Sequence, residues 1–534
     1  MADISFSFNK KLNVECDEVG TEEKIISNFV AEVPIYKCRI ITDQGKFECK
    51  RPDCFDVFSI LVKISTAISY ASKFRRVIKE LQKQNTVYMD VREYVELHFP
   101  EELKKIMKDP FSWILEKTSR LIIGNEKEKI AVLLSLVSSQ FERQNGIYRI
   151  HLLFIGSPGS GKSSTVKSVL KLLPETDMLI MLSRMTKNAL AYFPVENLDN
   201  RVLFLEELDD LDMLTQLKKL LSEGRLETAY AMSDKEKGEI ETKLKIIEGM
   251  PSFITTTVIP LRYDYEMEQT LSRIFILYRG KIEPKVLDKI AELIGKKEVE
   301  IYSKAEKLSF YAWLISRPKL VKVKDEVKQQ IVAELKKISE TATTAITRME
   351  SIYFLLVQAV AATRGKTIAD KEDLEFVNKW FKRDILLNAF AIDERDLKIL
   401  NMLVGKERRI KEIANELHSS VALTKKVLSR LIEDKNLVDY YQDDNGNVVY
   451  TLSEMGSSLI ATLTETDEEY QVVKIDELQQ IYEMLKNKEF TVDEFNSMFA
   501  SDVERVQFEN WAKDHGVFVE RDGKIYILDR SEQR

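Results

Sequence analysis

The segment from Gly156 to Ser163 holds residue types that could bind phosphate. It matches in full the pattern of two spaced glycines followed by a lysine and a hydroxyl residue. Its glycines allow successive backbone N–H groups to converge on an anion, and the helix that follows directs its positive dipole end to the same place. We therefore expect Lys162 to reach the β- and γ-phosphates of ATP and the Ser163 hydroxyl to hold Mg²⁺. The residues expected to bind the nucleotide are Gly156, Ser157, Pro158, Gly159, Ser160, Gly161, Lys162, Ser163 and Ser164.

A pair of acidic residues could supply the second half of such a site. The apolar run Val202 to Leu205 leads directly into Glu206 and Glu207. At the end of a buried strand that faces the phosphate loop, one carboxylate can complete the Mg²⁺ shell and the other can orient or polarise the attacking water. We assign Glu206 to the metal and Glu207 to the water. The alternative interpretation is a solvated strand end.

Two further groups of residues could act on the γ-phosphate. The apolar segment "MPSFITTTVIP" ends in threonines, and we expect Thr257, with Thr256 as the next choice, to reach the γ-phosphate or the attacking water. Arg273 is flanked by apolar residues, and Arg348 lies at the start of an expected helix. A planar guanidinium group can stabilise the charge of a transferring phosphoryl group. Each arginine could instead be a solvent-facing salt-bridge partner.

A strand, a loop and a helix must position these residues. Mostly apolar residues, 151–155, precede the phosphate loop and a helix-period run follows it, which is the context that the motif requires. Residues 105–282 alternate between strand and helix patterns, which predicts an α/β core with a mainly parallel sheet between helices. Residues 1–104 indicate a small mixed α/β domain, and residues 283–390 are nearly all helical and are expected to form a lid.

The C-terminal part contains two segments of similar plan, residues 391–460 and 466–534. Each has three helical stretches followed by a hairpin, with expected turns at Asn445-Gly446 and Asp522-Gly523. This order predicts tandem winged helix-turn-helix domains.

The two segments differ in charge on the helix that would contact DNA. In the first, that helix would present Lys425, Lys426 and Arg430 to duplex DNA. Its inward-facing residues are expected to be Leu423, Val427, Leu428 and Leu431. The equivalent helix of the second segment is rich in acidic residues, so phosphate attraction is expected to be weak there. We expect the second segment to contact proteins or to pack, with a solvated surface as the alternative.

Composition limits the class of protein. The chain has 534 residues, of which 44% are hydrophobic, and this is enough for several domains. Its 80 basic and 87 acidic residues give a net charge of −7, so DNA contact must come from local patches. The first residues lack the apolar core of a signal peptide, and no apolar run approaches the ~18 residues that span a membrane. We expect an intracellular, cytoplasmic protein without membrane contact.

The four cysteines could suggest a metal site. A reducing interior argues against disulfides. Zinc needs close ligand pairs, and Cys49 with Cys54 is the sole pair near that spacing, while Cys16 and Cys38 lie far apart in the sequence. We expect ordinary thiols rather than zinc.

With these positions defined, the chain resembles the minichromosome maintenance (MCM) helicases, a family of AAA+ ATPases. The segments "DPFSWILEKTSRLIIGNEKEKIAVLLSLV", "RIHLLFIGSPGSGKS" and "LSRIFIL" are similar to the family's lead-in, phosphate loop and arginine-finger segment. The segment that begins "ITRMESIYFLL" is similar to its second-sensor helix. The resemblance implies an AAA+ core with a helical lid and a homo-oligomer, a hexameric ring. It also implies that Arg273 and Arg348 act on ATP bound by a neighbouring subunit.

The segment "ETAYAMSDKEKGEIETKLKII" occupies the place of the family's pre-sensor hairpin. By that resemblance, Lys235 or Lys237 would touch single-stranded DNA in the ring's channel; the alternative is a solvated tip. The chain departs from the family in Glu206, in a first-sensor threonine, in the short segment before the acidic strand and in a short N-terminal region. Superfamily 3 helicases of viruses and plasmids share the hairpin position and often the two glutamates.

These features predict an ATP-driven ring helicase that translocates on DNA during replication. The alternative is an AAA+ replication initiator or DNA-binding regulator, in which ATP drives assembly without unwinding. In either case replication partner proteins could bind through the C-terminal module.

Overall fold

The computed structural model describes most of the chain as two compact units, which we treat separately. Unit 1 contains residues 1–324 and 354–370, and unit 2 contains residues 325–353 and 371–534. The residues outside the description are 1–3, 10–11, 27, 43–44, 50–85, 144–147, 186–196, 234–239, 260, 262–264, 280–300, 340–345, 444–445, 472–481, 483–484, 492–494, 496–497, 499–507, 509–511, 513–516, 522–523 and 529–534. None of the described helices combines the length and apolar character needed to cross a bilayer.

The N-terminal part of unit 1 is an antiparallel sheet. Its strands pair in the order β1-β2-β3-β4, and β5 pairs with β3. The strands are β1 (Ile4–Asn9), β2 (Leu12–Ile26), β3 (Phe29–Thr42), β4 (Gly45–Cys49) and β5 (Val87–Asp90). The backbone register pairs Cys38 with both Cys16 and Cys49, while Cys54 lies outside the described residues. Within the part of the chain that the structure describes, no three His, Cys, Asp or Glu side chains form a potential metal-binding group.

The centre of unit 1 is a parallel five-stranded sheet with the order β12-β6-β11-β8-β7. The strands are β6 (Leu152–Gly156), β7 (Leu179–Leu182), β8 (Val202–Leu205), β11 (Ser252–Thr257) and β12 (Phe275–Arg279). Every residue of β8 and β11 is buried, as expected for a parallel sheet covered on both faces. The strand β11 lies between β6, which leads into the phosphate loop, and β8, which leads into Glu206. Because the three strands are parallel, their carboxyl ends lie at the same edge of the sheet.

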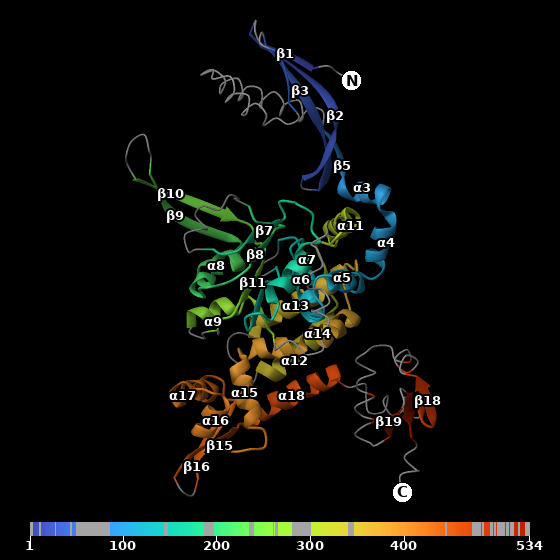
Figure 1. Ribbon diagram of the computed structural model, residues 1–534. Helices are drawn as coiled ribbons and strands as arrows, with labels where there is room; N and C mark the ends of the chain where they lie inside the picture. Colours follow the sequence, from blue (N-terminus) through green and yellow to red (C-terminus); the bar gives the residue numbers. More distant parts are fainter. Residues whose placement is uncertain are drawn as a thin grey trace. The chain divides into compact units, whose positions relative to one another are not determined.

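Helices cover both faces of this sheet (Figure 1). The helices α8 (Asp212–Glu223) and α9 (Tyr265–Leu271) pack on one face, where Leu217 and Leu271 join Leu203 and Phe253 in one apolar cluster. The helices α6 (Glu126–Ser138) and α7 (Lys162–Leu170) contact each other and the other face. The sequence prediction of an α/β core with helices on both faces is therefore confirmed.

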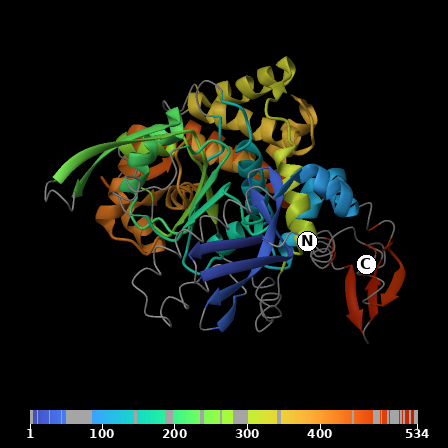
Figure 2. The same ribbon diagram turned by 90° about the horizontal axis from the view of Figure 1, so that it is seen from above.

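A β-hairpin is inserted into this core between α8 and β11. Its arms are β9 (Arg225–Ser233) and β10 (Ile240–Glu248), which pair from Arg225 opposite Glu248 to Ser233 opposite Ile240. The arms extend away from the sheet (Figures 1 and 2). The expected DNA-contacting residues Lys235 and Lys237 fall between the two arms in the sequence and lie outside the described residues.

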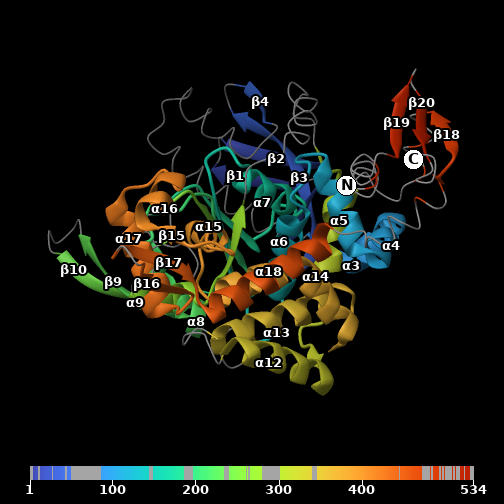
Figure 3. The same ribbon diagram turned by 90° about the horizontal axis from the view of Figure 1, so that it is seen from below.

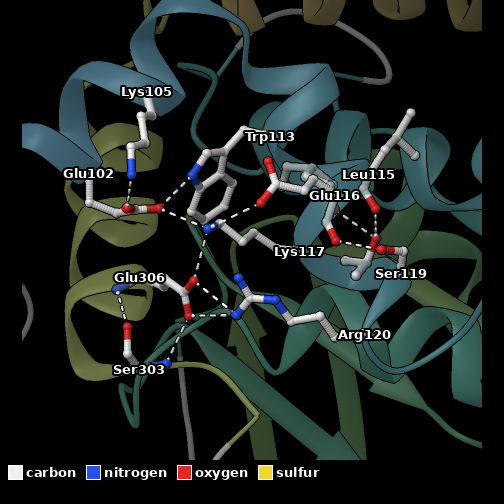
Figure 4. Close-up of polar contacts among 12 residues, drawn as sticks. Glu102, Lys105, Trp113, Leu115, Glu116, Lys117, Ser119, Arg120, Ser303 and Glu306 are labelled. Carbon is white, nitrogen blue, oxygen red and sulfur yellow. Dashed lines mark hydrogen bonds and ion pairs between the residues drawn. The ribbon is translucent and has the colours of Figure 1, made fainter. Parts of the chain in front are cut away.

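A buried charged network joins three helices of unit 1 (Figure 4). These are α4 (Pro100–Lys108), α5 (Pro110–Ser119) and α11 (Lys304–Ile315). The Lys117 ammonium lies 3.2 Å from a Glu102 oxygen and 2.9 Å from a Glu306 oxygen, and its side chain is 8% exposed. The Trp113 indole N–H donates to Glu102 at 2.8 Å, so the network satisfies several polar groups at once.

Burial by itself would raise the pKa of Glu102 and Glu306, but hydrogen bonds and nearby cations outweigh it and lower both. The donors are Trp113 and Lys117 for Glu102, and Lys117 and the Ser303 backbone N–H for Glu306. Burial alone would lower the pKa of Lys117, and the two carboxylates raise it instead. All three groups are therefore held in their charged forms.

Unit 2 contains helices and two small sheets. It begins with α12 (Asp325–Ser339) and the first part of α13 (Ile346–Thr363), where the Tyr353 hydroxyl donates to Glu334 at 3.0 Å. The long helices α14 (Lys371–Ala389) and α18 (Glu454–Gln471) lie side by side (Figure 3).

Between α14 and α18 the chain forms three α-helices, a short π-helix η2 (Arg430–Asp434) that continues the last of them, and a three-stranded sheet. The helices are α15 (Glu394–Met402), α16 (Ile410–Glu416) and α17 (Val421–Ser429). The sheet has the order β15-β17-β16, with strands β15 (Arg408–Arg409), β16 (Val438–Gln442) and β17 (Val448–Leu452). A second three-stranded sheet near the C-terminus consists of β18 (Lys488–Thr491), β19 (Phe518–Arg521) and β20 (Lys524–Ile527).

Candidate nucleotide site

The phosphate loop joins the end of β6 to the start of α7. Gly159 and Gly161 have φ angles of 75° and 74°, a left-handed conformation that favours glycine. A Cβ atom added at Gly159 would meet nothing within 4 Å, so the space beside the loop is open. The Lys162 ammonium lies over the loop and donates to the carbonyl oxygens of Gly156 and Ser157 at 2.8 and 2.9 Å.

Hydroxyl groups connect the loop helix to the neighbouring strands. The Ser163 Oγ lies 3.2 Å from the Thr256 Oγ1, and the Thr256 hydroxyl donates to the Glu206 carbonyl oxygen at 2.6 Å. The Thr257 hydroxyl instead donates to the Leu208 carbonyl oxygen at 2.9 Å and accepts from the Ile259 N–H. Alternation along β11 directs the Thr256 hydroxyl toward the loop helix, while Thr257, the first choice from the sequence, also lines the cleft and stays a prediction.

Each of the two glutamates contacts a cation from the same chain. Glu206 forms an ion pair with Lys167 of α7. A Glu207 oxygen lies 3.8 Å from a guanidinium nitrogen of Arg184, which follows β7. The Arg184 Nε lies 3.2 Å from an Asp209 oxygen.

Arg184 and both glutamates line one cleft at the carboxyl edge of the sheet, the position where open parallel sheets bind ligands. Its volume of about 460 Å³ lies within the range of small-molecule sites. It is lined by Pro158, Gly159, Lys162, Ser163, Ser183, Arg184, Glu206, Glu207, Thr256, Thr257 and Val258. The structure thus brings four of the expected loop residues, Pro158, Gly159, Lys162 and Ser163, together with both glutamates and both threonines.

The donor set of the cleft fits a nucleoside triphosphate with Mg²⁺. Hydroxyl and carboxylate oxygens are the ligands that Mg²⁺ prefers, and Ser163 and Glu206 would hold it. The loop's N–H groups and Lys162 would hold the phosphates. The metal would polarise the transferring phosphoryl group, and Glu207 would accept a hydrogen bond from the attacking water.

Arg273, one of the two predicted arginines, is not among the residues that line this cleft. Arg273 precedes β12 and therefore lies at the amino end of the parallel sheet, away from the cleft of its own chain. Arg273 is 8% exposed as a residue and its side chain donates to the Gln269 carbonyl oxygen, so the solvent-facing alternative is wrong. Arg348 lies in the first turn of α13, and its side chain is outside the description.

The structure differs from the predicted duplex-contacting face at two residues, Arg430 and Leu423. Lys425 and Lys426 are exposed as predicted. Arg430 instead forms ion pairs with the buried Asp396 and with Asp393, the latter at 3.6 Å. Leu423, which was expected to pack inward, is 41% exposed because it lies in the first turn of α17 beyond the core.

Lys167 and Arg184 were missed in the sequence, although each had a local signal. Lys167 lies four residues after Ser163 on the predicted helix, and residues at this spacing lie on the same face of an α-helix. Arg184 follows an apolar run, "MLIML", that could be recognised as a strand ending at the same edge. The sequence alone did not show that the strand before Arg184 pairs with the strand that ends in the two glutamates.

The loop, the cleft and the parallel sheet define a P-loop nucleotide-binding domain of the kind found in P-loop NTPases. Residues 99–311 match a family model described as the MTBMA_p00010 P-loop domain. The matched range contains the cleft, the hairpin β9–β10 and most of α11. A comparison with curated proteins finds no match to the chain.

Proposed function

We propose that this protein is an ATP-driven, ring-shaped DNA helicase or translocase that acts in DNA replication and resembles the MCM group of AAA+ proteins. The observation that carries the proposal is the hairpin inserted into the P-loop domain. Its arm β10 ends at Glu248, and β11 begins four residues later at Ser252 and carries Thr256 to Ser163. A change at the phosphate loop can therefore move the hairpin through a single buried strand.

The chemistry is ATP hydrolysis in the cleft. Lys162 neutralises the β- and γ-phosphates, Ser163 and Glu206 hold Mg²⁺, and Glu207 polarises the attacking water. Thr256 positions the Ser163 hydroxyl through their 3.2 Å contact.

DNA contact is proposed at two places. Lys235 or Lys237, which fall between the two hairpin arms in the sequence, would contact single-stranded DNA in the channel of the ring. We also propose that residues 391–460 form a winged helix-turn-helix domain, because helices α15 to α17 are followed by a hairpin of β16 and β17. The exposed Lys425 and Lys426 would then contact duplex phosphates.

A homo-oligomer, a hexamer by resemblance, would complete the site. Arg273 lies at the sheet edge opposite the cleft, so any contact between it and ATP would be made with a neighbouring subunit. Arg348 is proposed to act in the same way.

The deciding experiment measures ATP hydrolysis with and without single-stranded DNA, together with unwinding of a forked duplex. The expected result is stimulation of hydrolysis and ATP-dependent unwinding by the wild type, with both lost when Lys235 and Lys237 are changed to glutamate. Arg225→Ala, at the base of the same hairpin, is the control. ATP hydrolysis without stimulation or unwinding would favour the alternative, an ATP-dependent initiator or regulator that binds partner proteins through its C-terminal module.

A further inference from the structure

An arginine that the hydrolysis scheme leaves unused lies at the far end of the cleft. The strand β7 pairs with β8 so that Leu182 lies opposite Leu205. Continuing this register places Arg184 level with Glu207. Arg184 lines the same cleft as Lys162 and Ser163 but follows β7, the strand at one end of the sheet order.

The present partners of Arg184 hold it weakly. Its side chain is 73% exposed, and it lies 3.8 Å from a Glu207 oxygen and 3.2 Å from an Asp209 oxygen. Ion pairs at such exposure contribute little to stability, so the guanidinium can leave these carboxylates at a small cost. A phosphate group offers it two parallel, charge-assisted hydrogen bonds instead.

The sheet order indicates which phosphate Arg184 can reach. The loop after β6 holds the α- and β-phosphates with its backbone N–H groups. From β6 the strands follow in the order β11, β8 and β7, so a chain of phosphates that extends from the loop toward Glu207 brings its terminal group closest to Arg184.

We propose that Arg184 binds the terminal phosphate of ATP, within its own subunit, and so discriminates ATP from ADP. This inference rests on the proposed ATP site. When Arg184 contacts the γ-phosphate, Glu207 loses its cationic neighbour and can accept a hydrogen bond from water.

The test compares equilibrium binding of a non-hydrolysable ATP analogue and of ADP to the full-length protein. Arg184→Ala is expected to weaken binding of the analogue by about tenfold or more, because a charged hydrogen-bond partner is lost, while ADP affinity changes less than about twofold. Arg184→Lys should restore part of the discrimination. Arg225→Ala removes a similarly exposed arginine, which pairs with Glu227 at 2.8 Å outside the cleft, and should change neither affinity.

Lys162→Ala distinguishes failure of the proposed ATP site from failure of the proposed role of Arg184. If it leaves binding of both nucleotides intact, the ATP site itself is wrong and the Arg184 proposal falls with it. If Lys162→Ala abolishes binding of both nucleotides, the ATP site stands. The proposal for Arg184 is then overturned if Arg184→Ala lowers the affinities for the ATP analogue and for ADP equally, or changes neither affinity.

Discussion

Lys167 and Glu206 form an ion pair that joins the phosphate-loop helix to the acidic strand. Lys167 lies one helical turn beyond Ser163, so the two candidate Mg²⁺ ligands, Ser163 and Glu206, have an ammonium group beside them. Both side chains of the pair are 32% exposed, which leaves the carboxylate accessible to a competing cation. The metal must therefore share Glu206 with Lys167 or displace it.

Lys167→Met is expected to strengthen Mg²⁺ binding at the nucleotide site. Removal of a competing, partly exposed cation should lower the Mg²⁺ concentration that half-saturates nucleotide binding by about 2- to 5-fold. Titration of Mg²⁺ against binding of a fluorescent ATP analogue measures this shift. Lys167→Arg keeps the charge and should behave like the wild type. A higher Mg²⁺ requirement in Lys167→Met would show that Lys167 supports the site rather than competes for it.

Lys162→Ala and Glu207→Gln should fail at different steps. Without the Lys162 ammonium, the phosphates lose their fixed counter-charge, so both ATP binding and hydrolysis should be lost. Glu207→Gln keeps the loop intact, so it should bind ATP but hydrolyse it at least about 100-fold more slowly. Binding and single-turnover hydrolysis assays separate the two effects. Equal ATP affinity in both variants would contradict the assigned roles.

Arg273→Ala should leave ATP binding by one subunit nearly intact and reduce turnover by about 10³-fold if the arginine acts in a neighbouring site. Because Arg273 is 8% exposed, Arg273→Lys is the control for lost packing. Arg273→Ala and Lys162→Ala should regain hydrolysis when they are mixed, since a mixed oligomer contains intact shared sites. Mixed oligomers that remain inactive would exclude the assignment.

Lys117→Met should destabilise the P-loop domain at neutral pH by about 2 kcal/mol, because it removes the buried ammonium between Glu102 and Glu306 and leaves only the more exposed Lys105 and Arg120 as their cations. Lys105→Met is the matched control: this lysine also contacts Glu102, at 3.3 Å, but its side chain is 64% exposed and its loss should cost less than about 0.5 kcal/mol. Urea unfolding followed by tryptophan fluorescence measures both.

The same comparison at several pH values tests the sign of the pKa shifts. The pKa values of Glu102 and Glu306 are lowered by folding, so their contribution is complete above the ordinary glutamate pKa and is lost as the pH falls through the lowered values. The stability difference between the wild type and Lys117→Met should therefore shrink below about pH 4. A difference that is constant down to pH 3 would contradict this.

Lys425→Glu combined with Lys426→Glu should lower duplex affinity and flatten its salt dependence, because two phosphate contacts become repulsive. Deletion of residues 466–534 should change assembly or partner binding more than DNA affinity. DNA binding at two salt concentrations compares the two variants. A larger loss of affinity in the truncated protein would reverse this division between the two C-terminal segments.

The local chemistry of this protein is determined by short stretches of sequence. The spacing of Gly156, Lys162 and Ser163 defines a phosphate loop, because the loop conformation depends on neighbouring residues. The apolar run before Glu206 likewise predicts a buried strand that ends in carboxylates. The arms β9 and β10 could be predicted as a hairpin because their pairing partners are close in sequence.

Tertiary structure decided the contacts between residues that are distant in the sequence. The contact of Ser163 with Thr256 rather than Thr257 depends on the direction in which β11 presents its alternate side chains to α7. The pairing of Arg430 with Asp396, 34 residues earlier, removed a predicted DNA contact, since a buried carboxylate binds the guanidinium. Arg184 reached the cleft because β7 pairs with β8, and strand order in a parallel sheet is set by packing between distant segments rather than by local sequence pattern.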